Sequence, residues 1–298
     1  MKWEKLGQIF APAQKYPWMV SHAANPFVEH QSGDRFRIYF TCRDAHNRSS
    51  IAWADADLGQ RKILDVAEEP LLTPGEPGAF DDSGTALAWI ASIGGEKVFY
   101  YLGWDLSITV PWRNSIGLAV LDPHTGKLVR HSRAPILDRH DCDPFSISYP
   151  CVLPNGNGFE AWYGSNLQWG AKPETMNHVI KYATSSDGIL WERHGEIAIS
   201  LIGSEYALSK PCVIRDPDLY RMWYSHRGES YRLGYAESHD GRSWTRKDAE
   251  VGVAPSPSGW DSEMICYAHV FDHGGERMMV YNGNGYGLTG FGLARLVK

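Results

Sequence analysis

The sequence predicts an all-β protein, a single five-bladed β-propeller that spans residues 1–298, and three observations lead to this fold. A short hydrophobic strand ending in an aromatic residue occurs five times, with spacings of 61, 62, 61 and 57 residues, at Phe40, Tyr101, Tyr163, Tyr224 and Tyr281. Each strand stands in the same local order of turn, strand, polar loop and strand, and a repeat of about 60 residues is the size of one blade. No linker or low-complexity segment interrupts the repeats, and few segments have the pattern of a helix.

The third and fourth repeats match closely at their turns. Asp187-Gly188 is followed by Trp191, and Asp240-Gly241 is followed in the same way by Trp244. Asp-Gly is a strong signal for a two-residue hairpin turn, in which both turn positions have a positive φ. We therefore expect these segments to be structural turns at the blade edges and not parts of an active site.

The fifth repeat lacks an outer strand, because only residues 292–297 remain as a strand after the loop that follows Tyr281. The N-terminal segment 3–10 has a composition that suits a strand and can supply the missing one. We therefore expect the two ends of the chain to pair and to close the ring.

The cysteines indicate reduced thiols. The five residues, Cys42, Cys142, Cys151, Cys212 and Cys266, are odd in number and contain no C-x-x-C pair. Cys151 and Cys212 lie 61 residues apart in the matching phrases Tyr-Pro-Cys-Val and Lys-Pro-Cys-Val. These two are expected at the same buried strand position in neighbouring blades, where they would serve packing.

Composition excludes several classes of function. The net charge of −6 and the pI near 6.0 give no basic footprint for nucleic acid. The N-terminus lacks the apolar run of a signal peptide and no stretch has transmembrane length, so we expect a cytoplasmic protein without membrane insertion. Gly285-x-Gly287-x-x-Gly290 matches the dinucleotide fingerprint by letter, but only eight residues follow it, and no cofactor is expected. The oligomeric state stays open.

Acidic residues stand just before the expected innermost strand in four of the five repeats: Asp81 and Asp82, Asp141 and Asp143, Glu205, and Asp261 and Glu263. One such residue is usually a turn or a cap, but several carboxylates on one funnel destabilise a protein unless they are protonated, bridged or functional. Glycoside cleavage needs a carboxylic acid and a second carboxylate. The sequence therefore predicts Glu205 as general acid, Glu263 or Asp82 as the second carboxylate, and Asp143 as a charge partner, with Asp81 beside them.

Polar and aromatic side chains near the same rim form the expected carbohydrate-binding set. Three tryptophans would stack on sugar rings. No two histidines have the spacing of metal ligands, so no metal site is expected. The expected binding residues are His22, Asn25, Arg43, Asp44, Trp104, Arg113, Trp169, Arg227, Trp260, Asp261 and Asn282.

The repeats, the aromatic second strands and the Tyr-Ala-x-Ser-x-Asp-Gly-x-x-Trp turns resemble the five-bladed propellers of the arabinanase, levansucrase and invertase superfamily, which includes glycoside hydrolase families 43, 32, 62 and 68 and related phosphorylases. Phrases such as Ser21-His22-Ala23 and Phe80-Asp81-Asp82-Ser83-Gly84 resemble a bacterial group that accompanies polysaccharide-biosynthesis genes. The resemblance implies a glycoside hydrolase-like enzyme with a carbohydrate substrate.

The resemblance also implies a catalytic aspartate before a proline in blade one, an aspartate in blade three and a glutamate in blade four. Here Asn25 precedes Pro26, and the blade-three counterpart is Asp143 or, if the alignment follows Pro150, Tyr149. Two hypotheses stay open: a rebuilt site around Asp81, Asp82, Glu205, Asp261 and Glu263, or a funnel that binds sugar without cleaving it. A phosphorylase that binds phosphate through Arg43, Arg113 and Arg227 is a third.

Overall fold

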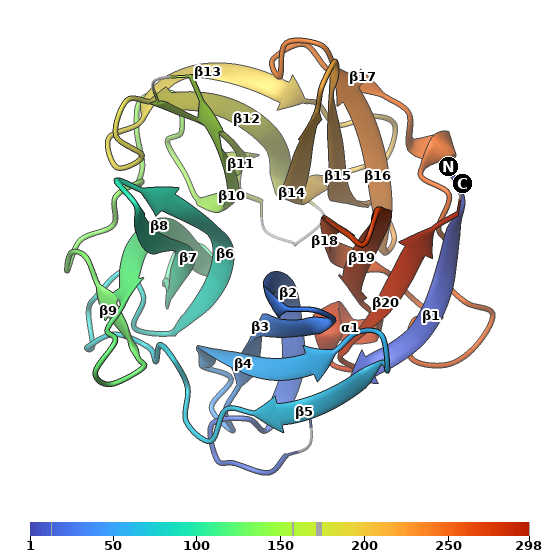
Figure 1. Ribbon diagram of the computed structural model, residues 1–298. Helices are drawn as coiled ribbons and strands as arrows, with labels where there is room; N and C mark the ends of the chain where they lie inside the picture. The colour runs from blue at the N-terminus through green and yellow to red at the C-terminus, as the bar shows by residue number, and fades with distance from the viewer. Residues whose placement is uncertain (13, 157, 171–174, 298) are drawn as a thin grey trace.

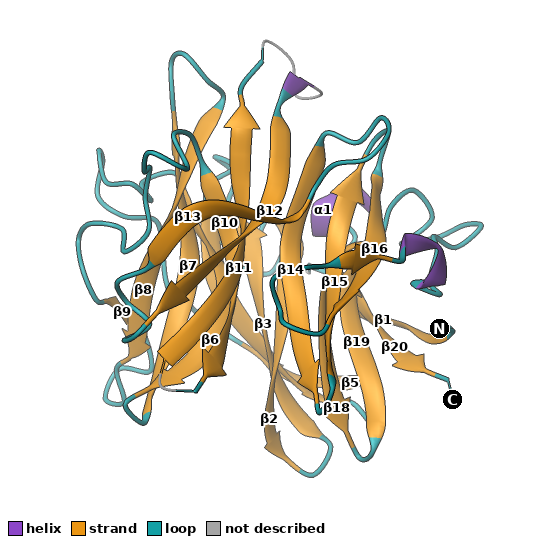
Figure 2. Ribbon diagram, turned by 90° about the horizontal axis from the view of Figure 1, so that it is seen from above, coloured by secondary structure: helices purple, strands orange, loops and turns teal. Residues whose placement is uncertain are grey.

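The computed structural model describes residues 1–12, 14–156, 158–170 and 175–297. Nearly all of its regular elements are strands (Figure 2), which confirms the all-β prediction. The helical segments in these ranges are η2 (Asp248–Glu250), a single 3₁₀ turn, and α1 (Asn284–Gly287). Neither these nor any other helix of the described residues has the length and apolar character needed to cross a membrane.

The first sheet has eight strands that form two sets of four. Antiparallel neighbours follow the chain order within a set, and one parallel bridge, from Ser49 to Gly84, joins the sets. The first set is β2 (Ser21–Ser32), β3 (Arg35–Arg43), β4 (Ser49–Asp57) and β5 (Lys62–Val66), and the second set is β6 (Gly84–Ile93), β7 (Glu96–Leu106), β8 (Trp112–Leu121) and β9 (Leu128–Arg130).

The second sheet repeats this plan with eight more strands. Its sets are joined by one parallel bridge from His178 to Ala207. The third set is β10 (Ile147–Asn155), β11 (Gly158–Gln168), β12 (Asn177–Ser185) and β13 (Glu192–Ile199), and the fourth set is β14 (Ala207–Asp216), β15 (Leu219–Arg227), β16 (Tyr231–Ser238) and β17 (Thr245–Arg246).

The third sheet combines the two ends of the chain. Its four strands, in the order β1-β20-β19-β18, form the fifth set: β18 (Cys266–His273), β19 (Glu276–Asn282), β20 (Phe291–Leu296) and β1 (Trp3–Phe10). β1 pairs antiparallel with β20 and places Trp3 opposite Leu296, so the chain ends lie side by side (Figure 1). No single sheet closes on itself among the described strands.

The sets are arranged around a common axis, with β2, β6, β10, β14 and β18 innermost (Figure 1). The second strand of a set returns to the end at which the first began. Ser21 therefore lies opposite Arg43, and Ala207 lies opposite Arg227. We call this end of the molecule the upper rim. The prediction that the starts of innermost strands share a rim with the loops leaving the second strands is confirmed.

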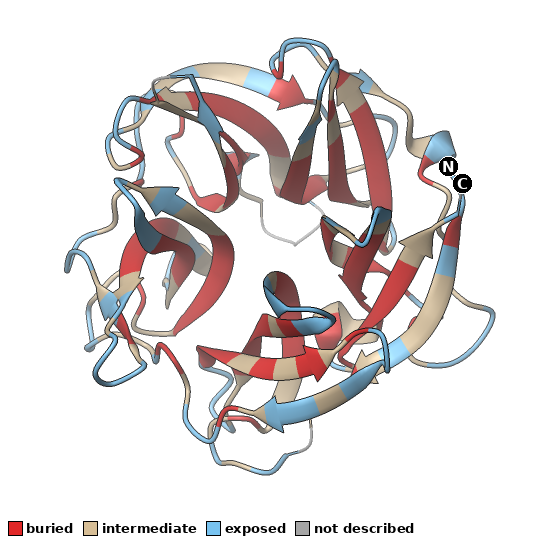
Figure 3. Cartoon of the chain, viewed as in Figure 1, coloured by how far each residue is buried: buried red, intermediate tan, exposed pale blue. Residues whose placement is uncertain are grey.

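The repeating aromatic residues belong to the core. Phe40, Tyr101, Tyr163, Tyr224 and Tyr281 are at most 1% exposed. Burial falls from the inner strands to the outer strands of each set (Figure 3). The regular spacing of aromatic residues in the sequence therefore reflects packing between neighbouring sets.

The Asp-Gly turns are structural, but they are not two-residue hairpins. In the third set β12 ends at Ser185 and β13 begins only at Glu192. Gly188 has a positive φ of 75°, whereas Asp187 does not have a positive φ. Asp187 instead accepts hydrogen bonds from the backbone N–H groups of two residues that follow it. The carbonyl of Gly188 accepts a 2.6 Å hydrogen bond from the hydroxyl of Tyr100, so the turn connects the third set to the second.

The innermost strands also contact one another through side chains. Cys151 and Cys212 are free thiols buried at the same strand position, as predicted. The Cys151 Sγ accepts the backbone N–H of Val213, and the Cys212 Sγ accepts that of Val270, both at 3.3 Å. Each thiol therefore satisfies a backbone donor of the next set along the chain, in addition to filling space.

Candidate functional site

Three of the predicted catalytic or binding carboxylates are buried inside separate sets. Asp81, Asp143 and Asp261 are at most 1% exposed. Each accepts a hydrogen bond from the hydroxyl of the repeating tyrosine 20 residues later in the chain. The pairs are Asp81 with Tyr101, Asp143 with Tyr163 and Asp261 with Tyr281, at 3.2, 2.9 and 2.9 Å.

Each of these aspartates also pairs with a basic side chain from the outer strand of its own set. The partners are Arg130 for Asp81 at 2.8 Å, Arg193 for Asp143 at 3.1 Å and Lys5 for Asp261 at 2.6 Å. We call this arrangement of aspartate, tyrosine and base a clamp. The prediction that these carboxylates converge on the axis is wrong, because each is neutralised within its own set. Their buried ion pairs and hydrogen bonds suit a structural role.

The first set lacks a clamp for a simple chemical reason. It carries Phe40 where the other sets carry tyrosine, and Phe40 packs on Phe10 and Phe291 with ring centroids 4.9 and 6.0 Å away. Without a hydroxyl there is no donor for a buried carboxylate. The recurrent 20-residue spacing from aspartate to tyrosine is the sequence signal that would have identified the clamps.

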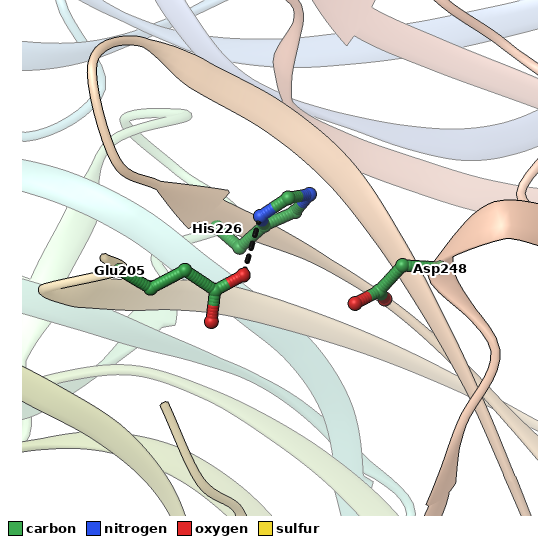
Figure 4. Close-up of side chains that lie close together, drawn as sticks. All are labelled: Glu205, His226 and Asp248. Atoms are coloured by element: carbon green, nitrogen blue, oxygen red, sulfur yellow. Dashed lines mark ion pairs between the residues drawn. The ribbon is translucent and has the colours of Figure 1, made fainter. Parts of the chain in front are cut away.

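Glu205 lies in a compact polar network of the fourth set (Figure 4). His226 Nδ1 lies 2.7 Å from Glu205 Oε1. The guanidinium of Arg246 donates to both oxygens of Glu205 at 2.8 Å and also to Asp248 at 2.6 Å. Asp248 in turn accepts a 2.6 Å hydrogen bond from the hydroxyl of Tyr224, so the fourth set has its own version of the clamp.

The network does not fit the predicted general acid. Burial alone would raise the pKa of Glu205, but hydrogen bonds from His226 and Arg246 lower it to about 2. Such a carboxylate is ionised at neutral pH and has no proton to donate. Glu205, His226 and Asp248 also have the spacing of a metal site. Arg246 already supplies positive charge between the two carboxylates, which makes this group a poor fit for a cation.

Asp82 lies in a polar pocket of about 380 Å³ on the upper rim, between the second and third sets. The pocket also contains Asp105, Arg113, Asn114 and Asp138. Asp82 accepts hydrogen bonds of 2.9 Å from the backbone N–H of Gly78 and the hydroxyl of Ser83.

Asp105, which the sequence analysis did not select as a catalytic or binding residue, lines the same pocket as Asp82, and the charge of Asp82 acts on it. Burial raises the pKa of Asp105, and the charge of Asp82 raises it further, while Arg113 acts against both. The pocket therefore combines a carboxylate held by two hydrogen bonds with a second one that retains its proton to a higher pH, which is the usual environment of an acid and base pair.

Two other predicted acids take no part in this pocket. The Glu263 side chain is exposed and makes no hydrogen bond or ion pair within the described residues. Asp44 accepts the backbone N–H groups of His46 and Arg48 and pairs with the Arg48 side chain, as the first residue of a turn does.

A different group of residues faces the axis. The innermost strands of the first, third, fourth and fifth sets bulge at Asn25, Tyr149, Lys210 and Tyr267, where φ is 54°, 38°, 49° and 55°. Positive φ is strained for residues other than glycine and is common at functional sites. In three of the four sets the bulged residue precedes a proline, a pattern that the sequence displayed.

These bulges bring together what we call the axis cluster. Asn25 Nδ2 donates to the Tyr149 hydroxyl at 3.2 Å, and the Tyr149 and Tyr267 rings lie 6.1 Å apart. The Tyr231 ring contacts the rings of both Tyr267 and Tyr286. The guanidinium of Arg227 lies 5.3 to 5.4 Å from the rings of Tyr206, Tyr231 and Tyr286. Its members are Asn25, Arg43, Tyr149, Lys210, Arg227, Tyr231, Tyr267 and Tyr286.

Lys210 is the most unusual member of the axis cluster. It is only 3% exposed and forms no ion pair within the described part of the chain. Burial lowers its pKa to about 8. A buried ammonium without a counter-ion destabilises the folded state, so an additional reason is needed for its presence.

The remaining predicted binding residues make structural contacts or lie near the surface. Asn282 is fully buried and accepts the backbone N–H of Asn25 at 2.8 Å, so it holds the first bulge in place. Trp260 packs on Tyr281 at 5.2 Å. Trp104 donates to Ser49 at 2.8 Å and lies 5.8 Å below the Arg43 guanidinium.

His22 and Trp169 are the last two of these predicted binding residues. His22 lies beside Ser21 on the upper rim, where burial and the charge of Arg43 lower its pKa to about 4. Trp169 pairs edge to face with Trp112 at 5.5 Å. The structure therefore brings Asn25, Arg43 and Arg227 together, and places Asp82 with Arg113 in the neighbouring pocket.

No model of a known protein family matches the sequence. Two proteins of Mycobacterium tuberculosis, named uncharacterized proteins MT1551 and Rv1502, are 47% identical to the chain over 298 residues, with 99% of both proteins covered. The match covers almost the whole length of the chain and of both relatives.

Solved structures share the fold at low sequence identity. A complex of BT0996 with RGII has a TM-score of 0.74 and 20% identity over 98% of this protein and 90% of its own length. An endo-arabinase from Bacteroides thetaiotaomicron has a TM-score of 0.67 and 12% identity, with 97% of both proteins covered. A structure of the GH130 family of mannoside phosphorylases has a TM-score of 0.69 and 14% identity over 98% and 93%. The chain thus belongs to the same family as MT1551 and Rv1502, and it shares its fold with β-propeller glycoside hydrolases.

Proposed function

We propose that this protein is a glycoside-active enzyme that acts on a bacterial glycan or its precursor, with Asp82 and Asp105 as its pair of carboxyl groups. The observation that carries the proposal is the raised pKa of Asp105 beside Asp82 in a polar pocket of about 380 Å³. The fold of its structural neighbours makes glycoside chemistry the first class to test, and its relatives in a bacterium favour a bacterial glycan.

The two carboxyl groups have complementary roles in this proposal. Asp105, whose pKa is raised by burial, is the general acid that protonates the leaving oxygen. Asp82 is fixed by hydrogen bonds from Gly78 and Ser83, so it is oriented as the base or nucleophile. Arg113 and Asn114 line the same pocket and would hold sugar hydroxyl groups.

A second function, carbohydrate binding without cleavage, is favoured by one observation. Asn25 and Tyr149 occupy the axis positions where the superfamily resemblance implies acids, and neither side chain can act as a carboxylate base. In that case the upper rim would bind a glycan during polysaccharide assembly, and the Asp82 pocket would only contribute contacts.

We also infer that the five strand sets form one ring of five blades and one domain over residues 1–298. Pairing of β1 with β20 supports this, since it completes the fifth set with a strand from the other end of the chain. The first to fourth sets each hold four strands in chain order, which supports counting each as a blade.

Hydrolysis of a panel of aryl glycosides and bacterial oligosaccharides tests the function. We expect turnover by the wild type and a decrease in kcat of about 10² to 10⁴-fold in Asp105→Asn and Asp82→Asn. Glu192→Gln, which removes an exposed carboxylate of β13, is the matched control and should keep wild-type activity. Full activity of Asp105→Asn would contradict the assignment, and binding without any turnover by the wild type would favour the second function.

A further inference from the structure

Three basic side chains on the upper rim have no acidic partner. Within the described residues, Arg43, Lys210 and Arg227 form no ion pair, whereas Arg37 and Arg221, on the same strands as Arg43 and Arg227, pair with aspartates at 2.8 and 2.7 Å. The whole chain has a net charge of −6, so acidic side chains are not scarce. The lack of acidic partners for these three cations is therefore specific to this region and does not follow from the composition of the chain.

These three cations act on the same small volume. Burial raises the pKa of the Cys266 thiol, and both Arg227 and Lys210 lie close enough to oppose that shift. Burial also raises the pKa of the Tyr149 phenol, and the charge of Arg43 opposes it. Cys266 also acts on Tyr149 and raises the pKa of its phenol further. The positive charges of Arg43 in the first set and of Lys210 and Arg227 in the fourth set therefore converge on the axis cluster.

Two acids that stand close to these cations, in the sequence or on the rim, are already neutralised. Asp44, next to Arg43 in the chain, pairs with Arg48 at 3.0 Å. Glu205 accepts both of its ion-pair hydrogen bonds from Arg246 and His226. Neither carboxylate is therefore free to act as a counter-charge for the three cations.

Hydrogen-bonding capacity is also unused there. The Nε atom of Arg227 and the Oδ1 atom of Asn25 are buried and have no partner among the described residues. Buried polar groups in folded proteins are nearly always satisfied, so such groups point to a missing partner. Tyr149, Tyr267 and Arg227 keep part of their surface exposed, which leaves the cluster open to a ligand.

We propose that the axis cluster binds the anionic group of a saccharide, a carboxylate or a phosphate, through Lys210, Arg227 and Arg43. Charge-assisted hydrogen bonds from an ammonium and two guanidinium groups suit both anions. The tyrosine rings of the cluster supply flat faces on which a sugar ring can stack. The anion site follows from the unpaired cations alone, and only the saccharide as its carrier rests on the proposed function.

Isothermal titration at pH 7 with four probes tests the proposal: D-glucuronate, glucose 6-phosphate, glucose and inorganic phosphate. We expect the two charged sugars to bind at least tenfold more tightly than glucose, and inorganic phosphate to compete with both. Lys210→Met and Arg227→Met should each weaken the charged sugars at least tenfold. Arg133→Met, which changes an arginine that is 95% exposed, is the matched control and should bind as the wild type does.

Equal binding of glucose and glucuronate, or unchanged binding by a folded Lys210→Met protein, would overturn the proposal. If the lysine variant does not fold, the salt dependence of glucuronate binding to the wild type decides the question instead, because only an ionic site weakens as salt increases. Binding of inorganic phosphate without either sugar would retain the anion site and remove the saccharide. The titration needs no turnover, so failure of glycoside cleavage leaves its result standing.

Discussion

Lys210 illustrates at the scale of one residue how a binding group can act against stability. Its ammonium is 3% exposed, lies on a strained bulge and has no counter-ion within the described residues. Neutral Lys is favoured by such surroundings, and its pKa of about 8 records that preference. A residue kept only for stability would be apolar at this position.

The stability of Lys210→Met should depend on pH in a specific way. The unfolded chain holds the lysine proton up to about pH 10.5, whereas the folded chain releases it near pH 8. Between these values the unfolded state binds more protons, so wild-type stability rises with pH. Below pH 8 the cost of the buried charge is fully present. We expect the methionine variant to be more stable than the wild type by about 2 to 3 kcal/mol at pH 7, and equal to it near pH 10.5.

Urea denaturation at pH 7, 9 and 10.5 measures this difference. Lys62→Met, at an exposed position of β5, is the control and should change stability by no more than about 0.5 kcal/mol at any of these pH values. A methionine variant less stable than the wild type at pH 7 would show that the lysine stabilises the fold.

At the scale of the element, the clamps explain why the acidic residues before the innermost strands recur. Asp143 accepts hydrogen bonds from Tyr163, Ser165 and Lys181 in addition to its ion pair with Arg193. Burial alone would raise the pKa of Asp143, but these hydrogen bonds lower it. The carboxylate thus joins the loop before β10 to the second, third and outer strands of its set.

Substitutions in two sets test this role by unfolding in urea. Tyr163→Phe should lower stability by about 1 kcal/mol, the value of one buried hydrogen bond. Asp143→Asn should lower it by about 3 to 5 kcal/mol, because Lys181 and Arg193 lose their counter-charge. Phe40→Tyr adds a hydroxyl where no aspartate can accept it, and should cost about 1 to 3 kcal/mol. A neutral Phe40→Tyr would contradict the clamp as the reason for the pairing.

The sequence predicted some elements of the candidate site and not others. Arg43 and Arg227 were found because they lie at strand ends that share a rim, which follows from counting strands, and Asn25 was found because it precedes Pro26 where the resemblance implies an aspartate. Asp105 was not selected, because its environment depends on Asp82 and Arg113, which only the folded loops bring near it. The clamps were misread as an active site because the 20-residue spacing from each aspartate to its tyrosine was not interpreted as a contact within one set.

At the scale of the whole molecule, periodicity carried most of the prediction. The aromatic spacing reflects packing between sets, and packing is a property that every set must satisfy in the same way. The Asp-Gly turns were correctly identified as structural, yet their length was wrong because the aspartate side chain caps the loop and replaces a tight turn. Side-chain hydrogen bonds of this kind are local exceptions that a repeat pattern does not reveal.

Ring closure by β1 can be tested by changing the order of the chain. Deletion of residues 1–10 removes the buried Trp3 and Phe10 and the Lys5 partner of Asp261, and we expect loss of cooperative folding. A circular permutant that carries residues 1–10 after the C-terminus through a short Gly-Ser linker contains the same strand and should fold, since β1 and β20 are antiparallel neighbours. Circular dichroism and urea unfolding compare the two, and a deletion as stable as the wild type would contradict closure.

The position of β1 also has a consequence for synthesis in the cell. Among the described strands, β1 leaves the ribosome before all the others and its partner β20 leaves it after them. At about 5 to 20 residues per second, β1 waits for about 15 to 60 s before its partner exists, while earlier sets already fold. During that time its edge is open to other nascent chains. Glu4 and Lys5 place charges on the waiting strand, and such charges oppose edge-to-edge pairing between chains.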